Sequence, residues 1–256
     1  MPDSTQGVKS DTNNLPTLSV VTVVCNGRGE IAKTMDSVLA QDYPNIEYIV
    51  IDGESTDGTR DIIQQFKDKL DVFICERDAG VYDAMNKATA RATGEFILFM
   101  NCGDVFASNG AVSSAMRFVQ PGIDQVIFGH WLRRTDDKVL TPCSPVIKKG
   151  LFNHQAVMYS RRIHAWHGGY VNVKGFTTAD YLFFATLFDS TAVTCRVIET
   201  MMAIIDVNGL SAGHRTLSQK FAIDFICGRV SKARLMMVLA AHPIYRQAKA
   251  LLGWRR

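Results

Sequence analysis

The first half of the chain alternates between short apolar runs and segments with helical spacing. β-branched residues dominate residues 18–25 and 46–51, and further apolar runs occupy 72–75, 95–100 and 125–129. Runs this short that are apolar on both faces are typical of strands buried inside a parallel sheet. The pattern therefore predicts five strands over these ranges.

The segments between these runs have apolar residues three and four positions apart. Ile62, Ile63, Phe66 and Leu70, for example, fall on one helical face. The spacing predicts helices at 30–40, 59–70, 81–91 and 111–119. Strands and helices that alternate in this way favour a sheet with helices on both of its faces. The predicted fold class is thus α/β, with a Rossmann-like and mostly parallel sheet.

The pattern loosens after residue 130. A β-ribbon is expected at 130–140, then an irregular stretch rich in Pro and Lys, and a helix near 180–188. Two short strands are predicted at 193–198 and 201–207. Residues 1–16 are polar and lack periodicity, so they are expected to form a disordered leader.

Charge divides the chain into two parts, although its formal net charge is only +3. Residues 1–210 hold 19 Lys+Arg and 24 Asp+Glu, a net of −5, whereas residues 211–256 hold nine Lys+Arg and one acid, a net of +8. An acidic main domain argues against nucleic acid as a partner. In the basic tail, apolar and aromatic residues alternate with cations, which is typical of an amphipathic helix on an anionic membrane surface. The alternative is that the apolar face packs on the body and the cations are solvated.

The spacing of the cysteines bears on the cellular compartment in which the protein is expected. All six are widely spaced and form no C-x-x-C pair, and the N-terminus has no secretory signal. A reducing cytoplasm is the expected location. The longest apolar run of the tail, 235–241, is far shorter than the roughly 20 residues that span a bilayer.

Polar clusters follow the predicted strands, where ligands bind in sheets of this kind. Asp52 stands at a strand end, too early to cap the next helix, and its carboxylate could accept hydrogen bonds from a nucleobase imide or a ribose hydroxyl. Asp78 and Lys87 could hold a sugar and a phosphate. A solvated helix face is the alternative for the cluster around Lys87.

The cluster at 101–104 closes the fourth predicted strand. The carboxylate of Asp104 can bind a divalent cation, which would neutralise a diphosphate leaving group. Gly103 would let the backbone approach a ligand closely. A helix-capping turn is the alternative for this cluster.

Residues 27–32 match the dinucleotide pattern G-x-G-x-x-A, and Asp52 follows about 20 residues later. An NAD-dependent oxidoreductase is therefore one alternative. It is weakened because nothing later in the chain is typical of a hydride-transfer site.

Three motifs in register resemble family 2 glycosyltransferases of the GT-A fold. They are DGESTDGT at 52–59, DAGVYDAMNKA at 78–88 with ATGE at 92–95, and FMNCGD at 99–104. The resemblance spans roughly 18–213 and is strongest to the exopolysaccharide branch, which includes colanic-acid biosynthesis transferases. It implies a GT-A domain at 17–213, with a nucleotide-sugar-binding half at 17–130 and an acceptor-binding half at 131–213. Residues 214–256 would be the basic helical tail.

The resemblance also implies an activity. The family transfers a sugar from a nucleotide-diphosphate donor, here expected to be a UDP-sugar, with inversion. The acceptor would be a polyprenyl-diphosphate-linked saccharide at the inner face of the bacterial inner membrane. Because the Q-x-x-R-W motif of processive synthases is absent, one sugar per encounter is expected.

By position, the resemblance assigns roles to individual residues. Asp52 would contact the base and Asp78 the donor, and Asp104 would bind Mg²⁺ or Mn²⁺ in a motif with a single carboxylate. The residues expected to line the donor site are Asn26, Asp52, Asp78, Tyr82, Asn86, Lys87, Asn101 and Gly103.

The acceptor side is assigned from the later part of the sequence. Asp180 lies in TTAD, which resembles the motif that supplies the catalytic base; a helix N-terminal charge is its other role. His154 and Gln155 are expected near the acceptor, and His214 could approach the metal from a loop. Because 101–104 holds only one acid, a catalytically silent nucleotide-sugar-binding protein remains a further alternative.

Overall fold

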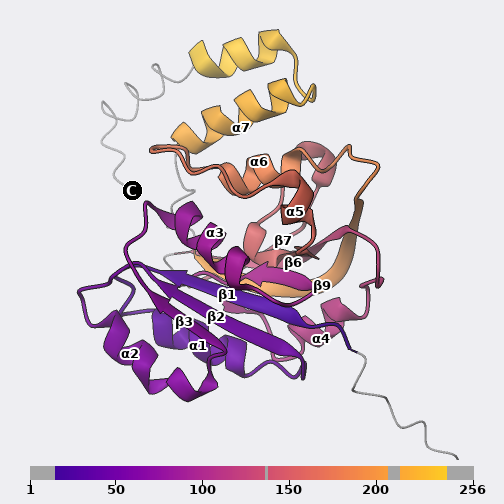
Figure 1. The fold of residues 1–256 in the computed structure, drawn as a ribbon. Coiled ribbons are helices and arrows are strands. Elements are labelled where there is room, and N and C mark those ends of the chain that lie inside the picture. Colours follow the sequence, from indigo (N-terminus) through magenta and orange to yellow (C-terminus); the bar gives the residue numbers. More distant parts are fainter. Residues whose placement is uncertain (1–14, 136–137, 207–213, 241–256) are drawn as a thin grey trace, which may run out of the picture.

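The computed structural model describes residues 15–135, 138–206 and 214–240 (Figure 1). Residues 1–14 of the expected leader therefore lie outside the described residues. The strands are β1 (Leu18–Val24), β2 (Ile46–Asp52), β3 (Val72–Cys75), β4 (Phe96–Phe99), β5 (Val105–Phe106), β6 (Gln125–Arg134), β7 (Leu140–Cys143), β8 (Val157–Ser160) and β9 (Thr194–Asp206). The α-helices are α1 (Ile31–Leu39), α2 (Thr59–Gln65), α3 (Val81–Arg91), α4 (Ala111–Met116), α5 (Ile163–His167), α6 (Ala179–Ala185) and α7 (His214–Ile226). Short 3-10 helices are η2 (Lys67–Lys69), η3 (Ile147–Lys149) and η4 (His154–Ala156), and residues 232–240 form a further helix.

One sheet connects the whole body. Its strand order is β3-β2-β1-β4-β8-β6-β9-β5, and β7 pairs with β6. Strands β1 to β4 are parallel, β8 is antiparallel to both of its neighbours, and β6 and β9 are parallel to each other. The sheet is therefore mixed and mostly parallel, as predicted. Because β8 lies between β4 and β6, the segments before and after residue 130 share this one sheet.

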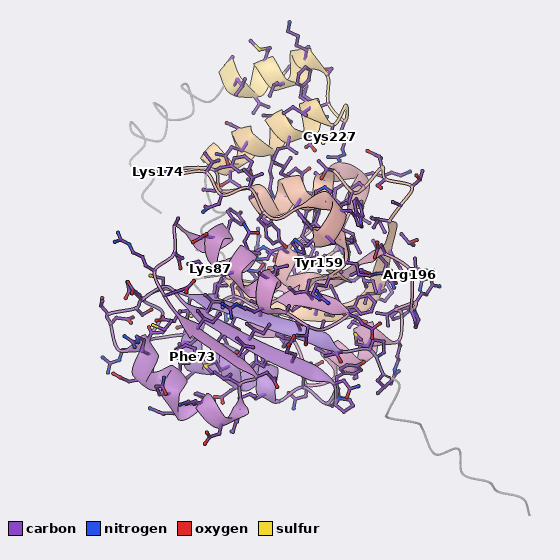
Figure 2. All side chains as sticks on the ribbon, viewed as in Figure 1. Phe73, Lys87, Tyr159, Lys174, Arg196 and Cys227 are labelled. Atoms are coloured by element: carbon purple, nitrogen blue, oxygen red, sulfur yellow. The ribbon has the colours of Figure 1, made fainter. Side chains whose placement is uncertain are left out.

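Alternating side chains of the strands build two cores. Val20 and Val50 face one side with α1, α2 and α4, whereas Val21 and Ile51 face the other with α3, α5 and α6. Figure 1 shows the same arrangement, with α1 and α2 on one face of the sheet and α3, α5 and α6 on the other. Figure 2 shows side chains filling the space on the second face, where Tyr159 is labelled. Residues at positions i and i+1 of a strand point in opposite directions, and helices cover both sets of apolar side chains, so both faces of the sheet are buried.

The strand register fixes where the polar loops meet. Val24 pairs with Asp52, and Asp52 pairs with Cys75, so β1, β2 and β3 end at the same level. The loops that follow these strands consequently gather at one edge of the sheet. This is the edge at which the sequence places its polar clusters.

Several predicted elements differ from the observed ones. The helix predicted at 59–70 ends at Gln65 and continues as η2. The residues predicted as strands at 193–198 and 201–207 do form a strand as far as they are described, but the break between them is wrong, because they join in the single strand β9. Its pairing with β6 shifts register around His130, between Val197 and Met201, which is where the sequence suggested a break. The β-ribbon expected at 130–140 is confirmed by the antiparallel pairing of β6 with β7.

The stretch expected to be irregular contains β8 and α5. These elements have four and five residues, too few for a periodic pattern to identify. β8 nevertheless lies in the centre of the sheet, and it carries Tyr159 into the core.

The start of the basic tail packs on the body through α7. Ile223 forms a small core with Tyr181 and Ala185 of α6. In Figure 1 the helix 232–240 lies farther out, beyond α7. None of the helices within the described ranges is long and apolar enough to cross a membrane.

Candidate active site

The loops after β1 and β2 are held together by hydrogen bonds. The amide of Asn26 donates to Ser55 Oγ at 2.7 Å, and the amide of Thr56 donates to Asn26 Oδ1 at 2.9 Å. Asn26 itself has a φ of +55°, a left-handed conformation that Asn tolerates better than most residues. Asn26 therefore shapes this corner of the sheet edge.

Asp52 is fully buried at the end of β2. Its Oδ2 accepts the Ser55 amide at 3.1 Å and the Cys75 thiol at 3.2 Å, and its Oδ1 accepts the Ser55 hydroxyl. An ionised carboxylate has about four acceptor positions. Asp52 thus uses most of its hydrogen-bond acceptor positions within the protein, two of them to close the turn after β2 and one to bind β3.

Asp78 approaches that turn from the end of β3. Its Oδ1 accepts the Gly80 amide at 2.9 Å, and its Oδ2 lies against Gly53, where an added Cβ would come within 2.3 Å. Burial raises the pKa of the nearby Cys25 thiol, and the carboxylates of Asp78 and Asp52 raise it further. Three loops therefore converge on Asp52 and Asp78, as the predicted donor site requires.

Lys87, a half-buried residue of α3 that is labelled in Figure 2, forms bonds within the protein. Its Nζ donates to the carbonyl of Arg77 at 2.7 Å and lies 3.0 Å from Glu76 Oε1 and 3.3 Å from Asp83 Oδ2. The ammonium group ties α3 to the loop after β3. A phosphate would have to compete with two carboxylates for it.

Asn86 also has internal partners. Its Nδ2 donates to the Tyr170 carbonyl at 2.8 Å, and its Oδ1 accepts the Tyr170 amide at 2.8 Å. Gly169 lies so near that an added Cβ would come within 2.6 Å of Asn86 Oδ1. Both polar ends of the side chain are therefore used to hold the segment after α5 on α3.

The loop after β4 is anchored on α1. Gly103 has a φ of +102°, and its amide donates to Thr34 Oγ1 at 3.1 Å. The Thr34 hydroxyl donates in turn to the Asp104 carbonyl at 2.9 Å. This positive φ favours glycine at 103, because L side chains rarely adopt it, whereas the predicted close approach of a ligand stays a prediction.

The Asp104 side chain is buried, with 8% of the residue exposed. Burial raises the pKa of Asp104 to about 6, although His154, the Asp206 backbone and Gln155 act in the opposite direction. Gln155 Nε2 donates to Asp104 Oδ2 at 2.5 Å. Gln155, predicted near the acceptor, thus contacts the predicted metal ligand.

His154 connects the loop after β4 with α6. Its Nδ1 lies 3.0 Å from Asp180 Oδ2, and its Nε2 lies 3.0 Å from Asn101 Nδ2. The Tyr82 hydroxyl donates to the other oxygen, Asp180 Oδ1, at 2.8 Å. The structure therefore brings together residues from four elements that the sequence assigned to separate roles.

This network changes the acidity of Asp180. Burial by itself raises the pKa of Asp180, but the contacts with His154 and Tyr82 outweigh it, and the net shift is downward. Burial and the nearby carboxylate raise the pKa of the Tyr82 hydroxyl far above its usual value. Asp180 is therefore an ionised carboxylate that receives two hydrogen bonds.

The residues around Asp104 fit a divalent cation only in part. Among the described residues no group of three or more His, Cys, Asp or Glu could hold a metal. Mg²⁺, however, commonly binds one or two carboxylates and completes its shell with substrate phosphates and water. A single Asp104 carboxylate is compatible with that arrangement. The side chain of His214, at the start of α7, lies outside the described residues.

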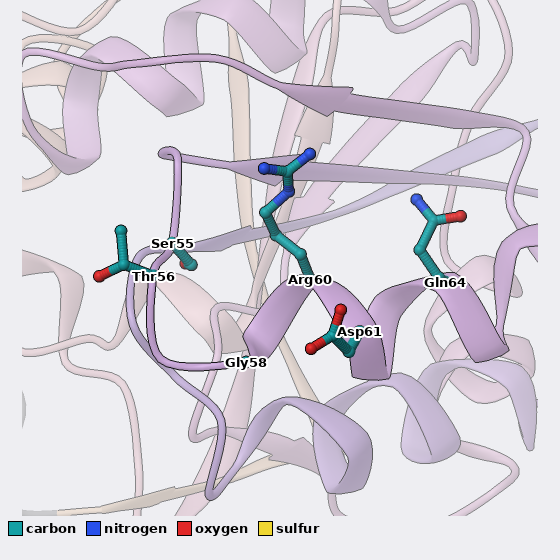
Figure 3. Close-up of a pocket in the computed structure, with 6 residues that line it drawn as sticks. All are labelled: Ser55, Thr56, Gly58, Arg60, Asp61 and Gln64. Carbon is teal, nitrogen blue, oxygen red and sulfur yellow. The ribbon is translucent and has the colours of Figure 1, made fainter.

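A shallow pocket borders this region at the start of α2 (Figure 3). None of the predicted site residues lines it, although three of the lining residues belong to the 52–59 motif. The lining residues are Ser55, Thr56, Gly58, Arg60, Asp61 and Gln64.

Sequence reasoning missed three residues that shape the site: Thr34, Ser55 and Cys75. Ser55 had a local signal, because a Ser three residues after an Asp is typical of a side-chain-capped turn. Thr34 and Cys75 had none, since their partners lie 70 and 23 residues away in the chain.

The fold and the site define a class, a GT-A glycosyltransferase. Solved structures support the fold. S. aureus TarS 1–349 in complex with UDP is similar with a TM-score of 0.64 and 17% identity, covering 88% of this chain and 70% of that one. The mannosyltransferase PcManGT from Pyrobaculum calidifontis, in complex with GDP-Man and Mn²⁺, is similar with a TM-score of 0.66 and 18% identity. The match covers 96% of this chain and 78% of PcManGT.

The chain belongs to glycosyl transferase family 2, because the sequence model of that family matches residues 19–188. It is 42% identical over 96 residues to the putative teichuronic acid biosynthesis glycosyltransferase TuaG of Bacillus subtilis, a match that covers 36% of this chain and 38% of TuaG. It is 27% identical over 195 residues to a PGL/p-HBAD biosynthesis glycosyltransferase of Mycobacterium bovis. That match covers 73% of this chain and 76% of the relative. The protein is thus a glycosyltransferase, and the oxidoreductase alternative is not supported.

Proposed function

We propose that this glycosyltransferase transfers one sugar from a nucleoside-diphosphate donor, UDP being the expected nucleotide, to a lipid-linked saccharide with inversion. One observation carries the proposal. The contacts Asn101–His154–Asp180 and Gln155–Asp104 join the predicted donor motif to the predicted base. Similar proteins support the same chemistry, since TarS has been solved with UDP and with UDP-GlcNAc. TuaG is named as a putative glycosyltransferase of teichuronic acid biosynthesis, and the mycobacterial relative as one of PGL/p-HBAD biosynthesis.

The donor would occupy the edge at which β1 to β4 end. Asp78 would supply acceptors for the base and ribose, Asp52 would hold the turn that carries them and offer its remaining acceptor position, and Asn26 and Gly103 would shape the loops on either side. Asp104 would hold Mg²⁺ or Mn²⁺ together with the donor phosphates. When bound, such a cation supplies positive charge that stabilises the departing diphosphate. The acceptor hydroxyl would lose its proton at the corner formed by Asp180 and His154.

A pair of glycine substitutions tests the donor site. Gly53→Ala would force the Asp52 turn and Asp78 apart, because the new Cβ would lie 2.3 Å from Asp78 Oδ2. UDP affinity, measured by calorimetry with Mg²⁺, should fall by about tenfold or more, equivalent to at least about 1.4 kcal/mol. Gly29→Ala is the matched control, since an added Cβ there meets nothing within 4 Å. Equal UDP affinity in the two variants would contradict this placement.

Transfer itself is tested by nucleoside diphosphate release from a panel of UDP-hexoses and GDP-mannose. Release that survives Asp104→Ala and Asp180→Asn unchanged would overturn the assigned mechanism. A wild type that binds UDP but releases nothing from the panel, with or without added lipid-linked saccharide, would support the silent binding protein instead.

We also propose that the tail attaches the enzyme to an anionic membrane surface. Ile223 packs on α6, but Ile226 and Met237 are 77% and 69% exposed, and Lys232 and Arg234 lie between them in sequence. Large apolar side chains beside cations suit a surface of anionic lipid, where apolar burial and charge attraction act together.

Flotation of the full chain with liposomes tests this attachment. The wild type should float with vesicles containing phosphatidylglycerol and much less with phosphatidylcholine alone, whereas Ile226→Glu/Met237→Glu should stay unbound. Val173→Glu is the control, because Val173 is 60% exposed but lies outside the tail. Flotation of the double variant equal to that of the control would refute the proposal.

A further inference from the structure

The turn that carries Asp180 is tied to the beginning of the basic tail. Asp180 lies in the first turn of α6, whose N-cap residue is Thr178. Within the described residues, five hydrogen bonds join residues 175–178 to α7, and Gln219 makes four of them. Figure 1 shows α7 on the outer side of α6, so that α6 lies between α7 and the sheet.

Gln219 uses both ends of its amide in these contacts. Its Oε1 accepts from the Thr177 amide at 2.9 Å, the Thr177 hydroxyl at 3.2 Å and the Thr178 hydroxyl at 3.1 Å. Its Nε2 donates to the Gly175 carbonyl at 2.8 Å. A backbone amide can only donate and a backbone carbonyl can only accept, so these two partners fix the orientation of the Gln219 amide.

The same contacts determine how α6 starts. A Thr at the N-cap position commonly accepts a backbone N–H of the helix with its side-chain oxygen. The Thr178 side chain makes no such cap and donates to Gln219 instead. Thr178 is buried, and its carbonyl accepts the Leu182 amide at 2.9 Å, which closes the first turn around Asp180. Gln219 therefore holds the residue from which the helix begins.

The chain reaches this turn through an exposed segment. Residues 171–175 are all exposed, and the preceding Tyr170 is held on α3 by Asn86. The partly buried Phe176 packs against the cores on either side of it. Apolar packing is non-directional, so it keeps the segment on the body without fixing the position of its backbone. The hydrogen bonds of Gln219 supply that position.

The carboxylate of Asp180 is held from the opposite direction. The Tyr82 hydroxyl donates to its Oδ1 at 2.8 Å, and His154 Nδ1 lies 3.0 Å from its Oδ2. The side chain is thus anchored by α3 and η4, whereas the backbone that carries it is anchored by α7. A catalytic base must lie within hydrogen-bond reach of the proton that it removes, so both anchors bear on catalysis.

We propose that Gln219 is a positioning residue of the active site, which holds the start of α6 so that the Asp180 carboxylate meets the acceptor hydroxyl. This inference rests on the proposed function, in which Asp180 is the base. It assigns the first turns of the tail to the catalytic unit, in addition to the membrane contact proposed for residues further along. Gln219 forms none of these hydrogen bonds with a predicted donor-site residue, so it should act on turnover and not on donor binding.

Gln219→Met tests the inference, because methionine has a similar length but no amide. We expect kcat for nucleoside diphosphate release to fall by about 10–100-fold, the loss that a displacement of roughly 1 Å can cause. UDP affinity, measured by calorimetry, should stay within about twofold of the wild type. Gln219→Glu keeps the acceptor oxygen but loses the donor to Gly175, so its kcat should lie between the two. Leu217→Ala is the matched control on the same helix, since Leu217 is 45% exposed, and it should keep full activity.

A double-mutant cycle separates positioning from a general loosening of the tail. Thr178→Val removes the hydroxyl that donates to Gln219 and preserves the shape of the side chain. If the two residues act through one contact, Gln219→Met/Thr178→Val should be little slower than Gln219→Met alone. Losses of kcat that multiply in the double variant would show that the residues act separately, and the inference would be overturned.

The remaining outcomes separate this inference from the proposed function. If Asp180→Asn is inactive but folded Gln219→Met keeps kcat within about twofold of the wild type, only the inference is overturned. If Gln219→Met does not fold, the same criterion applies to Gln219→Glu and Thr178→Val. Asp180→Asn with wild-type kcat removes the base of the proposed function, and this inference with it.

Discussion

Two histidines ten residues apart meet opposite environments. His154 lies between the polar side chains of Asn101 and Asp180, whereas His164 stacks on Phe183 with ring centroids 4.8 Å apart. His164 Nε2 is 2.9 Å from the Tyr159 hydroxyl, and its Nδ1 is 3.1 Å from the Gly168 carbonyl. Nothing in the residue type distinguishes the two histidines. Packing places His154 among the site residues and His164 against the aromatic side chains of the core.

The His164 environment predicts a loss of stability in acid. Burial lowers the pKa of His164 from 6.5 to about 4, so the unfolded chain binds a proton here more readily than the folded one. The free energy of unfolding should fall as pH drops from 6.5 to 4, by up to roughly 3 kcal/mol from this group. Urea denaturation at several pH values would measure the slope. A His164→Gln variant that loses stability over this range as steeply as the wild type would contradict the assignment.

Asp52 shows how far single residues can be predicted. Its place at a strand end follows from the sequence, and the structure puts it at the shared edge. Its complete burial and the thiol of Cys75 beside it could not be foreseen, because Cys75 comes from a neighbouring strand 23 residues later.

At the level of elements, α3 serves as an anchor for the second half of the chain. Tyr82 holds α6 through Asp180, and Asn86 holds the segment after α5 through the backbone of Tyr170. The sequence assigned both side chains to donor binding because they share one helix start. Their actual partners follow residue 160: Tyr170 lies after α5, which is too short to predict, and Asp180 lies in α6, near the helix predicted at 180–188.

Asn86→Ala should therefore act mainly on stability. It removes two hydrogen bonds and leaves the Tyr170 amide and carbonyl without their partners, which should lower the free energy of unfolding by about 2–3 kcal/mol. Denaturation and UDP calorimetry would be measured on the same sample. Thr89→Ala is the control, since its hydroxyl bonds only to the Met85 carbonyl of its own helix. A large loss of UDP affinity without loss of stability would favour the original donor-binding role.

Across the whole molecule, the basic tail is joined to the acidic body through α7, where Gln219 bonds to Thr177 and Thr178 and a second cluster forms around Asp224. Asp224 Oδ1 accepts from the Tyr181 hydroxyl at 2.6 Å and from Arg229 Nη1 at 3.0 Å, and Arg229 also donates to the Ala185 carbonyl. The one acid of the tail thus takes part in its attachment to α6. Lys232 and Arg234 belong to the outer helix 232–240. Figure 1 shows this helix away from the sheet edge that holds the site.

Asp224→Ala should loosen the tail and leave the body intact. Removal of one member of a buried ion pair costs about 3–5 kcal/mol, because the other charge stays buried without its partner. Hydrogen exchange should become faster in α7 and unchanged in β1. Glu199→Ala is the control, since its side chain is 94% exposed. Unchanged protection of α7 would show that apolar packing around Ile223 is sufficient.

The sequence by itself determined the α/β class, the first four strands and their helices, and the edge at which the polar motifs gather. It could do so because these elements are local, and their periodicity follows from strand and helix geometry. Tertiary structure alone decided the insertion of β8 between β4 and β6, the single long β9, and the contacts of His154 with Asn101 and Asp180. These depend on segments tens of residues apart, which meet only when the sheet has formed. The charge pattern predicted a distinct tail, and packing on α6 decided which of its apolar residues are buried and which remain exposed.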